Sequence, residues 1–167
     1  MKKKWTLLLL ALALVLSVAP GAAAAEVAAN RCGENLTWTY DAGVLTVTGE
    51  GAMEDYLEGA PWAMYQNDIE KIVFEGGVTY IGAYAFRDYD ALTQIDFGEA
   101  MVEVGMEAFR ECDGLTSVTL PATLEIFGES CFEDCPNLLE VHCAGNFPTF
   151  RQDSFWKSSI PALLIKT

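Results

Sequence analysis

The feature that most constrains the fold of this chain is an internal repeat. Residues 69–160 consist of four segments of 23 residues each, 69–91, 92–114, 115–137 and 138–160, with no change of length. A fixed period of this size is typical of solenoids, in which each repeat forms one coil that stacks on the next. One column holds phenylalanine in all four copies: Phe86, Phe109, Phe132 and Phe155. We therefore expect these four rings to align as a buried spine.

Each copy opens with an alternating pattern of apolar and polar residues. The apolar positions are the fourth and the sixth, as in Ile72 and Phe74 or Val118 and Leu120, and a period of two indicates a half-buried strand. Near the end of a copy, apolar residues such as Cys131, Phe132 and Cys135 have a spacing that suits one inward-facing helical turn. We expect each coil to contain a strand, a turn, a second extended piece and a short helical turn. A single coil cannot bury its apolar face alone, so stacking should form one continuous parallel sheet.

The repeat resembles a known family. The pattern L-T-x-[VI]-x-[LF] followed by [VIF]-G-x-x-[AC]-F-x-x-C, closest in the second and third copies, is similar to the BspA-like, treponemal-type leucine-rich repeat of secreted and surface proteins of bacteria. The first copy departs in having Tyr89 where the others have Cys112 and Cys135, and the fourth has Arg151, Trp156 and Ser158 at three altered positions. The resemblance implies an α/β solenoid with a short right-handed coil. A degenerate last copy is expected of a capping coil.

The first 25 residues have the pattern of a secretory signal peptide. Three lysines precede an apolar run from Leu7 to Val18, and Ala23 and Ala25 form an A-x-A cleavage site. The apolar run is shorter than the ~20 residues that span a bilayer, so cleavage is preferred to a retained anchor. We expect a secreted, extracellular protein with no membrane contact after cleavage.

The charge of the chain excludes some partners. Removal of the leader leaves 7 basic and 24 acidic residues, a net charge of −17. Nucleic acid and anionic lipid would be repelled by such a protein. The simplest role of these acids is to keep the surface solvated.

Both ends of the repeat region are expected to be covered. Residues 26–68 do not fit the template, but LTWTY and VLTVTG flank Asp41, Ala42 and Gly43, which predicts a β-hairpin. We expect 26–68 to be an N-terminal capping segment and 69–167 to be the repeats plus a terminal strand. That strand, Ala162–Thr167, would face Leu163 and Ile165 inward after a slip of one residue. No wall-attachment signal follows, so the chain is either freely secreted or a fragment of something longer.

Five cysteines leave at least one unpaired within a single chain. Cys112 and Cys135 occupy one column of adjacent coils, where a Cα separation of ~4.8 Å permits a disulfide. We favour two buried thiols, because both side chains should point into the core in parallel. The spacing of the cysteines and His142 matches no common zinc site, and His142 and Cys143 should face opposite sides of a strand. No metal or cofactor is therefore expected.

Catalysis has no support in the sequence. There is no G-x-S-x-G motif, no phosphate-binding glycine loop, and no nucleophile motif to accompany His142, the only histidine. We expect no enzymatic activity.

Binding is the remaining function. Its candidate face consists of outward-pointing strand residues, namely Lys71, Gln94, Asp96, Ser117, Thr119, Glu140 and His142. The family resemblance implies adhesion to a protein or cell-surface ligand; the alternative is a structural or accessory domain with no ligand of its own.

Overall fold

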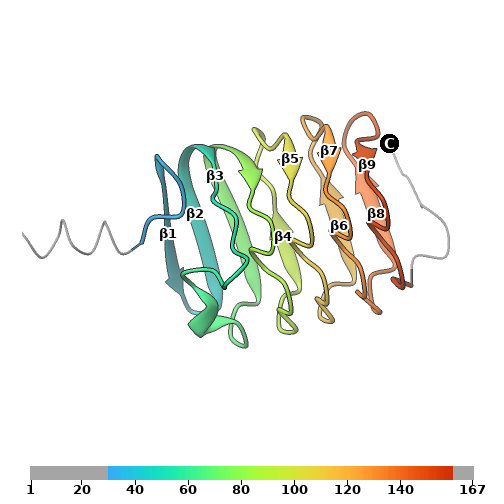
Figure 1. Cartoon of the computed structure of the whole chain (residues 1–167), viewed down its shortest axis with the longest axis horizontal. Coiled ribbons are helices and arrows are strands. Elements are labelled where there is room, and N and C mark those ends of the chain that lie inside the picture. Colours follow the sequence, from blue (N-terminus) through green and yellow to red (C-terminus); the bar gives the residue numbers. More distant parts are fainter. Residues whose placement is uncertain (1–29, 160–167) are drawn as a thin grey trace, which may run out of the picture.

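The computed structural model describes residues 30–159, which form an elongated stack of coils with β1 at one end and β8 and β9 at the other (Figure 1). We call 69–91, 92–114, 115–137 and 138–159 coils 1 to 4. The only helix among the described residues is the 3-10 helix η1, Ala63–Tyr65. The strands are β1 (Leu36–Asp41), β2 (Val44–Ala52), β3 (Lys71–Ile81), β4 (Gln94–Asp96), β5 (Glu103–Val104), β6 (Ser117–Leu120), β7 (Ile126–Phe127), β8 (Glu140–Cys143) and β9 (Thr149–Phe150).

The predicted β-hairpin before the repeats is confirmed. β1 and β2 pair antiparallel through a two-residue turn in which Ala42 and Gly43 have φ of 45° and 85°. Two successive positive φ angles are the signature of a type I′ turn, whose twist suits a hairpin. β2 also pairs in parallel with β3, from Val44 opposite Lys71 onward. The hairpin therefore joins the solenoid as an extra rung before coil 1.

The parallel sheet is not continuous, contrary to the prediction. β3 pairs with β4 at its beginning and with β5 at its end, and β5, β7 and β9 then follow one another in register. β6 pairs only with β8, in a separate two-stranded sheet. The side of the stack formed by the opening strands β4, β6 and β8 is thus interrupted between β4 and β6, whereas the row of second strands β5, β7 and β9 is unbroken.

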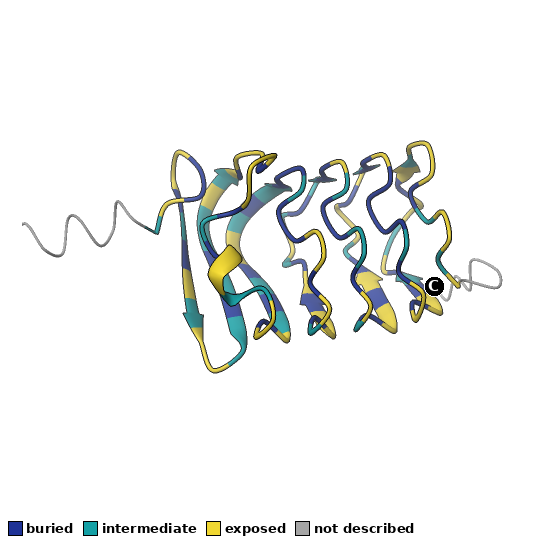
Figure 2. Cartoon of the chain, turned by 60° about the horizontal axis from the view of Figure 1, so that its bottom comes forward, coloured by how far each residue is buried: buried dark blue, intermediate teal, exposed yellow. Residues whose placement is uncertain are grey.

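The α/β description is not confirmed, because the expected helical turns are not helical in the four coils that the structure describes. In each coil two residues four apart adopt a positive φ, for example Tyr84 at 61° and Asp88 at 65° in coil 1, and left-handed residues interrupt an α-helix. Every second backbone N–H of this turn, at Tyr84, Phe86 and Asp88, points along the stack to the next coil instead. Phe86 N–H donates to the carbonyl of Ala108 and Asp88 N–H to that of Arg110, at 2.9 and 2.8 Å. The same pattern of buried and exposed residues recurs from turn to turn (Figure 2).

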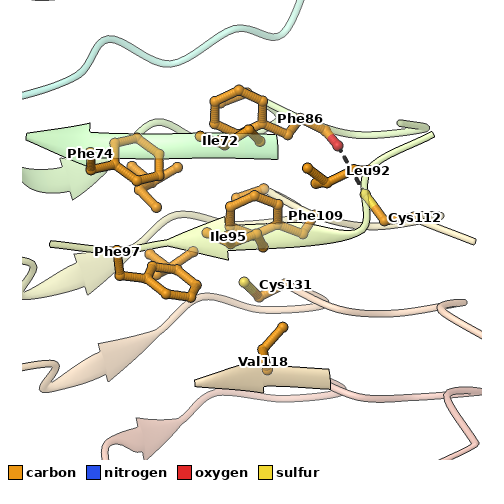
Figure 3. Packing of buried hydrophobic residues seen from close by; sticks show 14 of the residues in the cluster. Ile72, Phe74, Phe86, Leu92, Ile95, Phe97, Phe109, Cys112, Val118 and Cys131 are labelled. Carbon is orange, nitrogen blue, oxygen red and sulfur yellow. Dashed lines mark hydrogen bonds between the residues drawn. The ribbon is translucent and has the colours of Figure 1, made fainter. Parts of the chain in front are cut away.

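The phenylalanine spine, defined as Phe86, Phe109, Phe132 and Phe155, is confirmed. Successive ring centroids lie 5.4, 5.2 and 5.7 Å apart with interplanar angles of 9°, 11° and 3°. The first three rings are fully buried, and Figure 3 shows Phe86 and Phe109 stacked beside Ile72 and Ile95 of their strands. Because the same side chain recurs every 23 residues, stacking one coil on the next brings identical rings face to face.

Aromatic residues cover the spine at the hairpin end. The buried ring of Trp62 stacks on Phe86 at 5.2 Å, and its indole N–H donates to the Ala85 carbonyl at 3.2 Å. Tyr56 N–H donates to the Ala83 carbonyl, and the carboxylate of Asp55 accepts a bond from Ala83 N–H, both at 2.8 Å. These groups satisfy the backbone of coil 1 in the way that a preceding coil would.

Two predictions fall outside the described residues, the signal peptide at 1–25 and the strand at 162–167. Within 30–159 no helix has the length and apolar character that crossing a bilayer requires.

Candidate functional site

The predicted binding residues all lie on strands of the interrupted side of the stack. Lys71 is on β3, Gln94 and Asp96 on β4, Ser117 and Thr119 on β6, and Glu140 and His142 on β8. Their side chains alternate with buried ones, and all are exposed except Lys71 and His142, which are half-buried. The predicted columns exist, since Lys71 is in register with Gln94, Ser117 with Glu140, and Thr119 with His142. We call these seven residues the strand face.

The break in the sheet crosses the middle of the strand face. Between coils 3 and 4, Leu139 and Glu140 donate to the Thr116 carbonyl and Ala144 N–H donates to the Leu120 carbonyl. Pro121 is the coil 3 counterpart of Ala144 and has no N–H to donate to coil 2. Among the described residues, Thr116 and Ser117 also lack the bonds to Thr93 that would correspond to those of Leu139 and Glu140. β4 and β6 therefore face each other with unpaired backbone groups.

A hollow of about 520 Å³ occupies this break. Four residues of the strand face line it, namely Gln94, Asp96, Ser117 and Thr119, together with Thr93, Gly98, Pro121 and Ala144. Ile95 and Phe97 contribute apolar surface between them. The structure thus brings four of the seven predicted residues together, and it leaves Lys71, Glu140 and His142 outside the hollow.

The lining of the hollow is suited to hydrogen bonding. An amide, a carboxylate and two hydroxyls converge there and are exposed, and two unpaired strand edges add backbone donors and acceptors. One oxygen of Asp96 accepts a bond from Gly98 N–H at 3.1 Å, which fixes the carboxylate at the rim. Such a site can bind an extended polar segment of a partner.

His142 is not paired with a hydroxyl or thiol nucleophile. Its Nε2 atom lies 2.9 Å from Oε2 of Glu140 on the same strand. As the alternation predicted, Cys143 is buried on the other side. The pair contributes a polar, partly charged rim to the strand face next to Ser117 and Thr119.

The cysteine column has a structural role in linking coils. The five cysteines are buried and not disulfide-bonded. Cys112 Sγ–H donates to the Phe86 carbonyl and Cys135 Sγ–H to the Phe109 carbonyl, both at 3.2 Å (Figure 3 shows the former). In coil 4 the hydroxyl of Ser158 takes the place of the thiol and donates to the Phe132 carbonyl of coil 3, at 2.5 Å. Burial raises the pKa of the Cys135 thiol to about 12 and that of Cys112 well above its ordinary value, so both thiols stay protonated and unreactive.

A second, acidic hollow of about 380 Å³ lies on the turn side. It is lined by Asp88, Asp90, Glu111, Asp113, Asp134 and Pro136. Burial, and then repulsion from Asp90 and its acidic neighbours, raise the pKa of Asp113. Within residues 30–159, no three His, Cys, Asp or Glu side chains are grouped closely enough to hold a metal ion. The acids of this hollow do not form a candidate metal centre.

Comparison with known proteins assigns the family. A profile described as the BspA type leucine rich repeat region matches residues 62–167, with six copies. The chain belongs to the BspA-type leucine-rich repeat family. The match begins at Trp62, the residue that stacks on the first ring of the spine, and it counts more copies than the four that the 23-residue period gives between 69 and 160. The match to this BspA-type protein therefore covers all four of the 23-residue repeats and the end of the segment before them.

Two solved structures of leucine-rich repeat proteins are similar to this chain. The crystal structure of the T. pallidum leucine rich repeat protein TpLRR aligns with a TM-score of 0.51 at 16% identity, over 72% of this chain and 63% of that one. A leucine-rich repeat protein from Eubacterium ventriosum aligns at 18% identity with a TM-score of 0.40, over 68% and 43% of the two chains. This BspA-type chain thus spans less than two thirds of either relative, and the first likeness supports the fold alone. A search of curated proteins found no match.

Sequence reasoning missed the break that creates the hollow. The signal was present in one column of the repeat, which holds Glu75, Gly98, Pro121 and Ala144. A proline there removes one inter-coil bond. The columns of side chains define the strand face, whereas the break depends on backbone hydrogen bonds between coils.

Proposed function

We propose that this protein is a secreted, non-catalytic interaction module that binds a protein or cell-surface ligand through its strand face. The observation that supports this most is the hollow between β4 and β6, where predicted binding residues and unpaired strand edges meet. Repeat proteins commonly recognise partners on an extended face, and an open strand edge can accept a strand of a partner. Adhesion to a host or microbial surface is the use that fits a secreted protein of this family.

The strand face is small, and its size sets the expected affinity. A standard interface buries roughly 800 Å² per partner, whereas the four strands of this face, ~4.8 Å apart and ~10 Å long, give on the order of 200 Å². The hollow adds depth and backbone groups to that area. We expect weak binding by one copy, so the capture experiment should present many copies on one support.

The test is capture of surface proteins by the immobilised chain from residue 26 onward. The variant replaces Asp96, Ser117 and Glu140 with alanine; a matched control replaces Asp113, Glu129 and Ser159, which are also two acids and one hydroxyl on exposed positions. Capture should fall at least ~10-fold in the first variant, about 1.4 kcal/mol, and stay unchanged in the control. Equal capture by the two variants would reject the strand face as the binding site.

The alternative is a structural or accessory domain without its own ligand. The small area of the strand face is the observation that favours it. No capture of any surface protein by the unmodified chain, at any density on the support, would favour this alternative.

Secretion and the division of the chain are parts of the same proposal. Cleavage after Ala25 would leave 142 residues, with 26–68 as the N-terminal cap and 69–167 as the repeats. Mass spectrometry of the exported protein tests the cleavage site directly. An intact leader on the exported protein would contradict it.

A further inference from the structure

The outer surface of coil 4 exposes large apolar side chains. Leu139, Phe147 and Trp156 are 49%, 50% and 56% exposed. Phe150 and the last ring of the spine, Phe155, are only partly buried. These residues belong to a single coil at the end of the stack opposite the hairpin (Figure 1).

Comparison with the inner coils shows that part of this exposure arises because coil 4 is the last coil that the structure describes. The counterparts of Phe147 are Val78, Met101 and Leu124, which are 2%, 0% and 3% exposed under the coil that follows them. Phe147 fills the same inward column, but nothing in the described chain stacks on it. The ring of Phe147 is therefore available for contact with a neighbour along the long axis of the stack.

Two further positions become apolar only in coil 4. Trp156 stands where the inner coils have Arg87, Arg110 and Glu133, and Leu139 stands where they have Glu70, Thr93 and Thr116. Arg87 and Arg110 reach across to acids of the next coil, at 3.1 Å from Glu107 and 3.5 Å from Glu133. A solvent-facing end coil normally has a polar outer face. In coil 4, by contrast, apolar residues replace the polar or charged residues of the inner coils at both positions.

Coil 4 is also the only one of the four coils with no net charge, in a strongly acidic protein. It has two acids, Glu140 and Asp153, against two bases, Arg151 and Lys157. Coil 2 has six acids and one base, and coil 3 has four acids and no base. Two copies of this chain would repel each other through most of their surface, but not at this end.

We propose that coil 4 packs end to end against coil 4 of a second copy of this chain, around a two-fold axis. Such an interface is isologous, so Leu139, Phe147 and Trp156 of one copy meet the coil 4 end of the other copy. The neutral charge of coil 4 selects a like partner over a basic one, and the covered hairpin end prevents growth of the stack in the other direction. The pairing joins two strand faces into one particle, which raises avidity for a repeated ligand.

The size of the end sets the expected strength. One coil is a loop of 23 residues whose two long sides lie ~10 Å apart, as in packed layers. Its end face, side chains included, has an area on the order of 600 Å². This is below the roughly 800 Å² per partner of a standard interface. The dimer should therefore be reversible, with a Kd of roughly 1–100 µM.

Sedimentation velocity of the chain from residue 26 onward, at concentrations spanning that range, tests the proposal. The expected result is a shift from monomer to dimer that stops at two copies. Replacement of Phe147 and Trp156 by glutamate should raise Kd at least ~10-fold. The control replaces Leu57 and Met64 by glutamate; these are 78% and 75% exposed at the hairpin end, and their loss should leave Kd unchanged. Thermal melts of each variant verify that the fold is retained.

A mixing experiment isolates the two-fold contact. The glutamate variant and the corresponding lysine variant, with Phe147→Lys and Trp156→Lys, should each be monomeric alone and should associate when mixed, because opposite charges then meet across the interface. Failure of the mixture to associate would overturn the coil 4 to coil 4 contact. A chain that stays monomeric at all concentrations would overturn it too, and would assign the cover of coil 4 to residues 160–167 or to another protein.

Discussion

Truncation of the central ring of the spine measures how much the stacking of coils stabilises this protein. Phe109 is fully buried, with parallel rings on both sides at 5.4 and 5.2 Å and Phe97 edge-on at 6.0 Å. Phe→Ala in a core costs about 3–5 kcal/mol, and two stacked pairs at about 0.5–1.5 kcal/mol each place Phe109→Ala at the upper end. Phe155 has the same ring at the open end, partly buried and stacked on one side only. Phe155→Ala should cost about half as much.

The assay is urea unfolding followed by far-ultraviolet circular dichroism. A domain stability of about 5–15 kcal/mol leaves a small margin for the loss expected of Phe109→Ala, so Phe109→Leu is measured as well. That variant keeps most of the volume and loses the stacking, for an expected cost of about 1–2 kcal/mol. Equal losses for Phe109→Ala and Phe155→Ala would refute the reasoning, because position in the stack would then have no effect on the energy of the ring.

Three further results are expected. Cys135→Ser should cost less than Cys135→Val, by about 1 kcal/mol in urea unfolding, because a hydroxyl can keep the bond to the Phe109 carbonyl as Ser158 does for Phe132; the reverse order would show that apolar packing dominates this column. Stability should fall as the pH rises above about 9, because the unfolded chain then loses thiol protons that the folded chain keeps, up to a pKa of about 12 at Cys135. Thermal melts from pH 7 to 10.5 check this, and a melting temperature that does not change with pH would contradict it. Asp113→Asn should raise the free energy of unfolding by a few tenths of a kcal/mol at pH 7, because the raised pKa of Asp113 means that its charge is disfavoured in the fold. The gain should vanish at acidic pH, where Asp113 is already protonated. A loss of stability at pH 7 would contradict the raised pKa.

The sequence predicted the features of this fold that depend on side-chain columns. Four copies of equal length required the rings of Phe86 and Phe109 to stack, and the alternation around Ile72 and Phe74 required a strand, and both are observed. The turn at Ala42 and Gly43 was also predicted, because short-range rules govern hairpins of this length. These features follow from local pattern and period alone.

The features that were missed depend on where backbone groups find partners. The apolar spacing around Phe132 fits a helical turn as well as a chain with left-handed residues at Ser130 and Asp134, and only the bonds to the next coil distinguish them. The gap between β4 and β6 depends on the pairing of two specific coils, to which Pro121 contributes. Of the candidate site, the sequence predicted the residues of the strand face but not the hollow that brings four of them together.

The constant spacing of the spine has a consequence for how a protein of this kind can change in length. Every bond between coils joins a residue to one about 23 positions away, as with Phe86 and Ala108 or Cys135 and Phe109. Loss or duplication of one whole unit would leave each remaining junction intact and shorten or extend the molecule by one rung of ~4.8 Å. A deletion of any other size would move part of one coil out of its columns, unless a loop of that coil absorbs the change. Differences in length among such chains should therefore come mainly as whole repeats of 23 residues.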